Sequence, residues 1–152
     1  MKNLRTTLLC VCLQLCGLCT LAQVEVRVNE PDMNKPKLFN TLPEKITVNP
    51  EKLAGLLTNP VGTDVNILIG DLMPFQGRVV SSSNTNDLMS SIVIRSTNYP
   101  EALLTFSRAI IDGIVTYSGR ILSMKHGDLF ELQLKNGEYI FIKKNFYDLV
   151  NE

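Results

Sequence analysis

The sequence predicts an all-β fold, an antiparallel meander of about seven strands that forms a small barrel or a two-layer sandwich. Apolar and polar residues alternate through most of residues 64–144, as they do in strands with one buried face. Dipeptides that suit tight hairpin turns separate the alternating runs, at Asp112-Gly113, His126-Gly127 and Asn136-Gly137. A barrel is favoured, because closing the sheet would remove its two unpaired edges.

Residues 1–22 are predicted to be a secretory signal peptide. Lys2 and Arg5 precede an apolar run from Leu8 to Leu21, and Ala22 provides a small residue for cleavage by an export peptidase. The run is too short for a spanning helix, so no membrane span is expected after cleavage. The mature protein is therefore expected in the periplasm, on the cell surface or outside the cell.

Cleavage after Ala22 changes the composition of the chain. All four cysteines lie in the removed segment, so the mature chain would be cysteine-free and would depend on its hydrophobic core. Removal of Lys2 and Arg5 takes two of the 15 basic residues and none of the 15 acidic ones, which leaves a net charge of −2. With this charge balance, the mature chain lacks the excess of basic residues that is typical of proteins that bind nucleic acid or anionic lipid.

Residues 23–47 are predicted to be an extended arm or linker, with a disordered tail as far as Lys37 as the alternative. VEVRV alternates and would suit an edge strand, but the following residues contain three prolines and no periodicity. We expect the arm to lay Leu38, Phe39 and Leu42 across the domain.

Residues 48–152 are predicted to be a single β-rich domain that starts with a short helix. Asn49 suits the N-cap and Pro50 the first helical position. A helix of two turns is not stable alone, so its leucines are expected to cover an open end of the sheet. These leucines are Leu53, Leu56 and Leu57.

Strands are predicted at residues 64–70, 75–81, 91–96 and 103–110, followed by three more within residues 112–144. The polar stretch SSSNTNDLMS, residues 81–90, is predicted to be a loop, and residues 145–152 a short C-terminal helical turn. In the last three strands, the turns at Asn136-Gly137 and His126-Gly127 pair Lys135 with Glu138 and Lys125 with Asp128.

The two registers agree on which residues share a face. The predicted core face collects Val115, Tyr117, Gly119, Ile121, Phe130, Leu132, Leu134, Tyr139 and Phe141. The opposite face mixes charged residues with aliphatic ones. If the turn at Asp112-Gly113 has two or four residues, Leu104, Phe106, Arg108 and Ile110 join the core face.

The mature chain lacks the motifs of most enzymes. With no cysteine and His126 alone, it has neither a thiol nucleophile nor a His/Cys zinc cluster, and it has no phosphate loop, GxSxG, HExxH or calcium loop. Glu131 and Glu138 would be the carboxylate pair of a glycosidase, yet their polar face favours solvated charges. The chain is therefore predicted to be non-enzymatic, with no catalytic residues, no metal and no cofactor.

Two surfaces are candidates for binding. Arg108 and Tyr117 are expected near the mouth of the barrel, where a guanidinium beside an aromatic ring would receive an anionic or polar ligand. The alternative is that Arg108 extends outward into solvent. The aliphatic residues of the outer face would meet a partner or be covered by the arm. They are Ile114, Leu122, Met124, Ile140 and Ile142.

The stretches IRSTNYPEALLTFSR and YSGRILSMKHGDLFELQLKNGEYIFIKKNFYDLVNE resemble a group of small exported bacterial envelope proteins of unknown function. The resemblance covers residues 75–152, and its most specific part is Tyr117-x-Gly119-Arg120-Ile121 followed by His126-Gly127-Asp128. It implies the fold and the location and supplies no catalytic residues. NGEYIFI also resembles the β-rich propeptides of secreted metalloproteases, but this mature chain lacks the cysteine by which those inhibit.

Three functions remain open on the sequence. The first is a non-catalytic exported β-domain that binds a protein, a glycan or a small ligand. The second is an inhibitor or propeptide-like partner of a secreted protease. The third is a hydrolase that uses an unrecognised carboxylate pair, Glu131 and Glu138.

Overall fold

The computed structural model describes residues 35–85 and 88–145 of the chain. The predicted signal peptide, the arm as far as residue 34 and the predicted C-terminal turn from residue 146 lie outside the described residues. No helix in the described ranges has both the length and the apolar character needed to cross a membrane.

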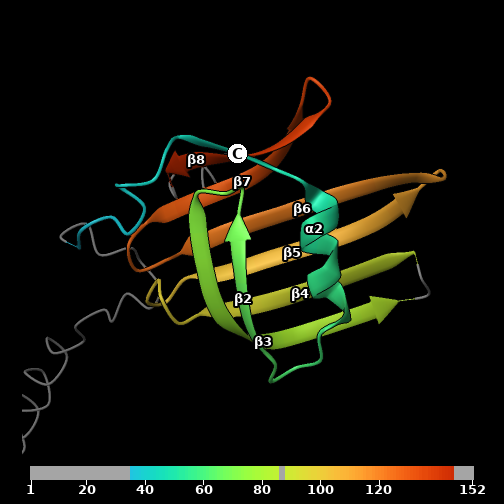
Figure 1. The fold of residues 1–152 in the computed structure, drawn as a ribbon, viewed down its shortest axis with the longest axis horizontal. Helices are drawn as coiled ribbons and strands as arrows, with labels where there is room; N and C mark the ends of the chain where they lie inside the picture. Colours follow the sequence, from blue (N-terminus) through green and yellow to red (C-terminus); the bar gives the residue numbers. More distant parts are fainter. Residues whose placement is uncertain (1–34, 86–87, 146–152) are drawn as a thin grey trace, which may run out of the picture.

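Eight antiparallel strands form one curled sheet with the shape of a half-barrel, which confirms the all-β prediction (Figure 1). The strands are β1 (Lys45–Val48), β2 (Asp64–Ile69), β3 (Met73–Thr85), β4 (Met89–Ser96), β5 (Leu103–Ile111), β6 (Ile114–Ser123), β7 (Asp128–Lys135) and β8 (Glu138–Asn145). Their order in the sheet is β1-β8-β7-β6-β5-β4-β3-β2, so β2 to β8 form the predicted meander.

The sheet curls without closing into the favoured barrel. β1, which falls in the stretch predicted to be an arm, is one edge of the sheet and β2 is the other. β1 ends at Val48 because Pro50 starts the helix and has no N–H to continue a strand ladder. The two edges approach each other at the β2–β3 turn, where Gly70 lies against Ile46 and the carbonyl of Thr47.

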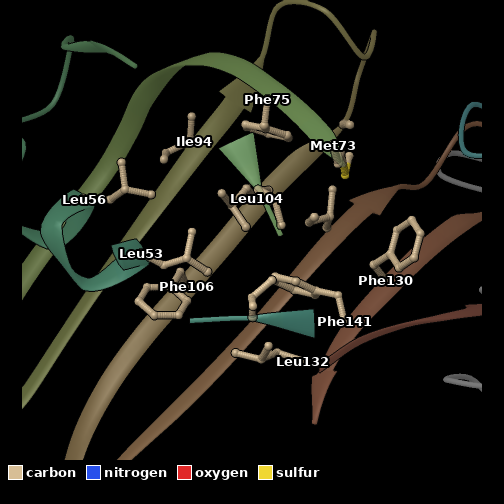
Figure 2. Packing of buried hydrophobic residues seen from close by; sticks show 14 of the residues in the cluster. Leu53, Leu56, Met73, Phe75, Ile94, Leu104, Phe106, Phe130, Leu132 and Phe141 are labelled. Atoms are coloured by element: carbon tan, nitrogen blue, oxygen red, sulfur yellow. The ribbon is translucent and has the colours of Figure 1, made fainter. Parts of the chain in front are cut away.

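The predicted short helix is present as α2 (Pro50–Ala54) continued by η2 (Gly55–Thr58). Asn49 is its N-cap, and the Asn49 side chain accepts a 2.9 Å hydrogen bond from the N–H of Glu51. The helix lies across the concave face of the sheet rather than over an open end (Figure 1). It lies there because the open half-barrel leaves Leu104 and Phe106 facing inward, and Leu53 covers them (Figure 2).

The core fills the concave side of the sheet. Five phenylalanines are fully buried in it, together with aliphatic residues from β1 to β7 and Met73 of β3. Of the predicted core face, Tyr117 and Tyr139 are half-buried at its border, whereas Val115 and Leu134 are exposed because they lie at the tips of their hairpins. The buried phenylalanines are Phe39, Phe75, Phe106, Phe130 and Phe141.

The arm packs across the domain as predicted from its three apolar residues. Phe39 is fully buried, and its ring lies 5.3 Å from that of Phe130 and 5.6 Å from that of Tyr99. Leu38 and Leu42 pack against the same core. The described part of the arm thus closes one end of the half-barrel and does not cover its outer face.

Polar contacts to the β6–β7 turn hold the arm in place. The N–H of Leu38 donates to the buried carboxylate of Asp128 at 2.6 Å, and the Lys37 ammonium donates to the carbonyl of Gly127 at 2.7 Å. His126 Nδ1 lies 2.8 Å from the carbonyl of Pro36, so this nitrogen carries the hydrogen. His126 is therefore a structural contact of the arm.

Asn136-Gly137 has the predicted register, and Asp112-Gly113 forms a two-residue turn, one of the two loop lengths that the sequence left open. Asp112-Gly113 and Asn136-Gly137 have positive φ at both residues, as a two-residue hairpin turn requires. At the third turn only Gly127 has a positive φ, so Met124–Gly127 form a longer turn and Ser123, rather than Lys125, pairs with Asp128. This shift of two residues leaves every side chain on its predicted face.

The prediction of a loop at residues 81–90 is wrong for most of these residues. β3 continues to Thr85 and β4 begins at Met89, so the two strands form a long hairpin. The stretch is polar because both faces of this part of the sheet are solvated, and a strand with two wet faces has no apolar alternation. Ser90 and Asn84 instead pair across the strands through a 3.0 Å hydrogen bond.

Candidate functional site

A row of polar and aromatic side chains crosses the concave face next to the core. In the strand register, Arg108 of β5 lies opposite Tyr117 of β6 and opposite Ser90 of β4. Ser90 in turn lies opposite Asn84 of β3. Tyr139 of β8 lies beside Tyr117. We call these five residues the concave shelf. The structure thus brings together the two residues that the sequence predicted to bind a ligand.

The aromatic half of the concave shelf is rigidly packed. The ring of Tyr117 stacks on that of Phe106 with centroids 5.8 Å apart and an interplanar angle of 16°. Tyr139 meets Tyr117 edge-on at 5.6 Å, and its hydroxyl accepts a 3.2 Å hydrogen bond from the backbone N–H of Tyr117. Such offset and edge-to-face pairs fix ring positions, so a ligand would meet a preformed surface.

Arg108 is half-buried on this shelf without a counter-ion. No hydrogen bond or ion pair joins its guanidinium to any other residue that the structure describes. Its cross-strand neighbours Ser90 and Tyr117 are neutral. A partly desolvated guanidinium whose five N–H donors have no protein acceptor favours a carboxylate or another anion bound beside it.

The five aliphatic residues predicted as an outer interaction surface do not lie together. Ile114 is at the tip of the β5–β6 hairpin, whereas Leu122 is eight residues further along β6, about 26 Å away at the usual strand rise. Leu122 and Met124 line a hollow of about 340 Å³ with Leu103, and Ile140 and Ile142 are half-buried on β8. Ile114 therefore lies on a different part of the surface from Leu122 and Met124.

The two carboxylates considered for hydrolysis are far apart. Glu131 pairs with Ile142 and Glu138 with Lys135, so four residues of strand separate them, about 13 Å at the usual rise. Glycosidases hold their two carboxyl groups about 5–9.5 Å apart. In the described part of the chain, no three His, Cys, Asp or Glu side chains come close enough to hold a metal ion.

Glu131 is held as a carboxylate by three partners on the outer face. The Lys144 ammonium lies 2.7 Å from one oxygen, Gln133 donates to the same oxygen at 3.0 Å, and Arg120 donates to the other at 3.1 Å. The hydrogen bond from Lys144 is the main cause that lowers the pKa of Glu131 to about 2, against the opposing effect of burial. A carboxyl group with this pKa carries no proton to donate at neutral pH.

We expect Glu131→Gln to lower the free energy of unfolding near neutral pH by about 1–2 kcal/mol, because its partners lose a charged acceptor. The folded pKa is depressed, so this stability is fully present above the unfolded value of about 4.5 and is lost as the pH falls towards 2. Urea unfolding of both proteins across this range measures the difference. Glu138→Gln, an exposed control, should change little near neutral pH; a Glu131→Gln difference that persists in acid would contradict this account.

Sequence reasoning missed three members of the concave shelf. Asn84 and Ser90 fell in the predicted loop, and Tyr139 was placed on the core face without a contact to Tyr117. The two-residue repeat set by Ile92 and Ile94 was a usable signal for Ser90, because Ser90 lies two residues before Ile92 on the same face.

Comparison with protein-family models, with curated proteins and with solved structures found no match.

Proposed function

We propose that the protein is a non-catalytic binding module that holds an anionic ligand, such as one with a carboxylate group, on its concave shelf. The observation that carries this proposal is the half-buried guanidinium of Arg108, which has no acidic partner among the described residues. A partly buried cation without a partner costs stability in the free protein, and an anionic ligand would recover this loss.

The neighbours of Arg108 suit a ligand with a flat or apolar portion next to its anionic group. Tyr117 presents an aromatic ring already held by Phe106, and Ser90 and Asn84 present a hydroxyl and an amide at the other end of the row. Binding sites of this kind combine an apolar wall with a few polar groups that orient the ligand.

A binding role is favoured over hydrolysis by the state of the carboxylates. Glu131 is neutralised by Lys144 and Arg120, and Glu138 is exposed at a hairpin turn. The signal-peptide pattern of residues 1–22 supports export of the module, with the cell envelope or the exterior as its place of action.

The proposal is tested by NMR titration of the protein with a short peptide that has a free C-terminal carboxylate and with the same peptide as its amide. We expect the free acid alone to shift the side-chain Nε–H signal of Arg108 and the ring signals of Tyr117. Arg108→Ala should weaken binding of the acid about tenfold, because a charge-assisted hydrogen bond contributes about 1.5–3 kcal/mol. It should not lower the melting temperature.

Arg95→Ala is the matched control, because Arg95 is an exposed arginine on the opposite face of the sheet. It should leave the titration unchanged. Equal affinity of Arg108→Ala and the unaltered protein for the acid would eliminate the concave shelf as an anion site.

A further inference from the structure

The sheet splits between β6 and β7. The β5–β6 ladder continues to the pair Ile111 and Ile114, whereas the β6–β7 ladder ends at Arg120 and Glu131. Residues 114–118 of β6 therefore have a strand partner on the β5 side and none on the β7 side within the described chain. Figure 1 shows the β7–β8 hairpin rising away from β6 towards its tip.

The register shows which backbone groups face the split. The two-residue turn at Asp112-Gly113 makes Ile111 and Ile114 a hydrogen-bonded pair, so by alternation Val115 and Tyr117 turn their N–H and C=O groups away from β5. The hydrogen bond from the Tyr117 N–H to Tyr139 Oη confirms this direction, because Tyr139 belongs to β8. β6 thus presents a short strand edge with donors and acceptors at strand spacing.

The hydroxyl of Tyr139 occupies part of this edge, in a position that a carbonyl of an added strand would take. It accepts there from the N–H of Tyr117. Next to it, Val115 is 40% exposed and Leu134 of the facing hairpin is 59% exposed, although both belong to the concave face. On the outer side the split opens into a hollow of about 280 Å³, lined among others by Ser118, Gly119 and Leu132. The side chains of its walls therefore fill the split only in part, through Tyr139.

We propose that the free edge of β6 binds an extended peptide segment of another protein as an added strand. Such strand addition takes its affinity from backbone hydrogen bonds and its specificity from every second side chain. Residues of the peptide opposite Val115 and Tyr117 would point to the concave side, beside Leu134, and are expected to be apolar. Residues between them would face the outer side with Thr116 and Ser118 and are expected to be polar.

The probe for the test is a linear peptide selected from a phage-displayed random library on the full-length protein and then synthesised. Amide hydrogen exchange with and without this peptide is the readout. We expect the Val115 and Tyr117 amides to slow at least about tenfold, while that of Thr116, which pairs with Ala109 of β5, stays unchanged. The proposal is overturned if the selection yields no binding peptide, or if the peptide protects the amide of Thr116 as much as those of Val115 and Tyr117. So does protection of Val115 in the free protein, since the edge would then be occupied already.

Two variants of one residue separate backbone pairing from side-chain contact. Val115→Pro removes the N–H that faces the split and no ladder bond to β5, so peptide affinity should fall at least about tenfold. Val115→Ala keeps that N–H and should cost about threefold or less. Equal losses would refute strand addition.

Tyr139→Phe removes the hydroxyl that competes for the Tyr117 N–H, and affinity should rise about threefold; a loss of affinity would contradict the proposed displacement. Arg95→Ala, which alters an exposed arginine of β4 on the opposite face of the sheet, should keep peptide binding.

Discussion

Replacing Phe39 with alanine is expected to lower the free energy of unfolding by about 3–5 kcal/mol, which is a large part of the stability of a typical domain. Phe39 is fully buried and its ring contacts those of Phe130 and Tyr99, so its removal leaves a cavity between three elements. Loss of the ring also weakens the packing of the arm against the β6–β7 turn. Chemical denaturation of the two proteins measures the change.

Leu72→Ala is the control for this prediction. Leu72 lies in the β2–β3 turn and is 57% exposed, so deleting a large apolar side chain there should cost about 0.5 kcal/mol or less. A Phe39→Ala loss no larger than that of the control would mean that the arm is not part of the folded unit.

The second large effect is expected from Gly70→Ala, at about 2–5 kcal/mol. Gly70 has a φ of +58°, which an alanine adopts at a cost, and its added Cβ would overlap with Ile46 Cγ2 and the carbonyl of Thr47. The substitution would therefore push β1 away from the β2–β3 turn, a place where the two edges of the sheet approach each other. Thermal and chemical unfolding measure the loss.

Gly62→Ala isolates the backbone part of this effect. Gly62 also has a positive φ, +93°, but a Cβ there has no neighbour within 4 Å. It should cost about 1–2 kcal/mol, the conformational penalty alone. If both substitutions destabilise equally, the contact between the two sheet edges is absent in solution.

The molecule has one closed end and one open end. The arm, with Phe39 and its contacts to Asp128 and Gly127, closes the end at the β6–β7 turn. The opposite end carries Arg108, Tyr117 and the free edge of β6, and its hairpin tips expose several large apolar residues. These are Leu88, Met89, Ile111, Ile114, Val115 and Leu134. The two proposed binding surfaces thus lie at the end of the molecule where these apolar residues are exposed.

The alternation of side chains was enough to determine the meander and the faces of its strands. Side chains in a strand repeat every two residues, so an error of two residues at the His126-Gly127 turn still left Ile121 and Phe130 in the core. Asn136-Gly137 gave the correct register and Asp112-Gly113 the correct position of a turn, because few other sequences adopt positive φ at both residues. The same alternation placed Arg108 beside Tyr117.

Only the tertiary structure decided how the sheet ends and where it opens. β1 is recruited from an irregular stretch because Ile46 and Val48 fit the edge of β8, a long-range fit that no local pattern contains. The sheet stays open because β1 pairs with β8 and not with β2 in the described chain, and it splits at Arg120 because the β7–β8 hairpin twists away from β6. Curvature, edges and splits depend on how distant segments pack, so they are absent from the periodicity of the chain.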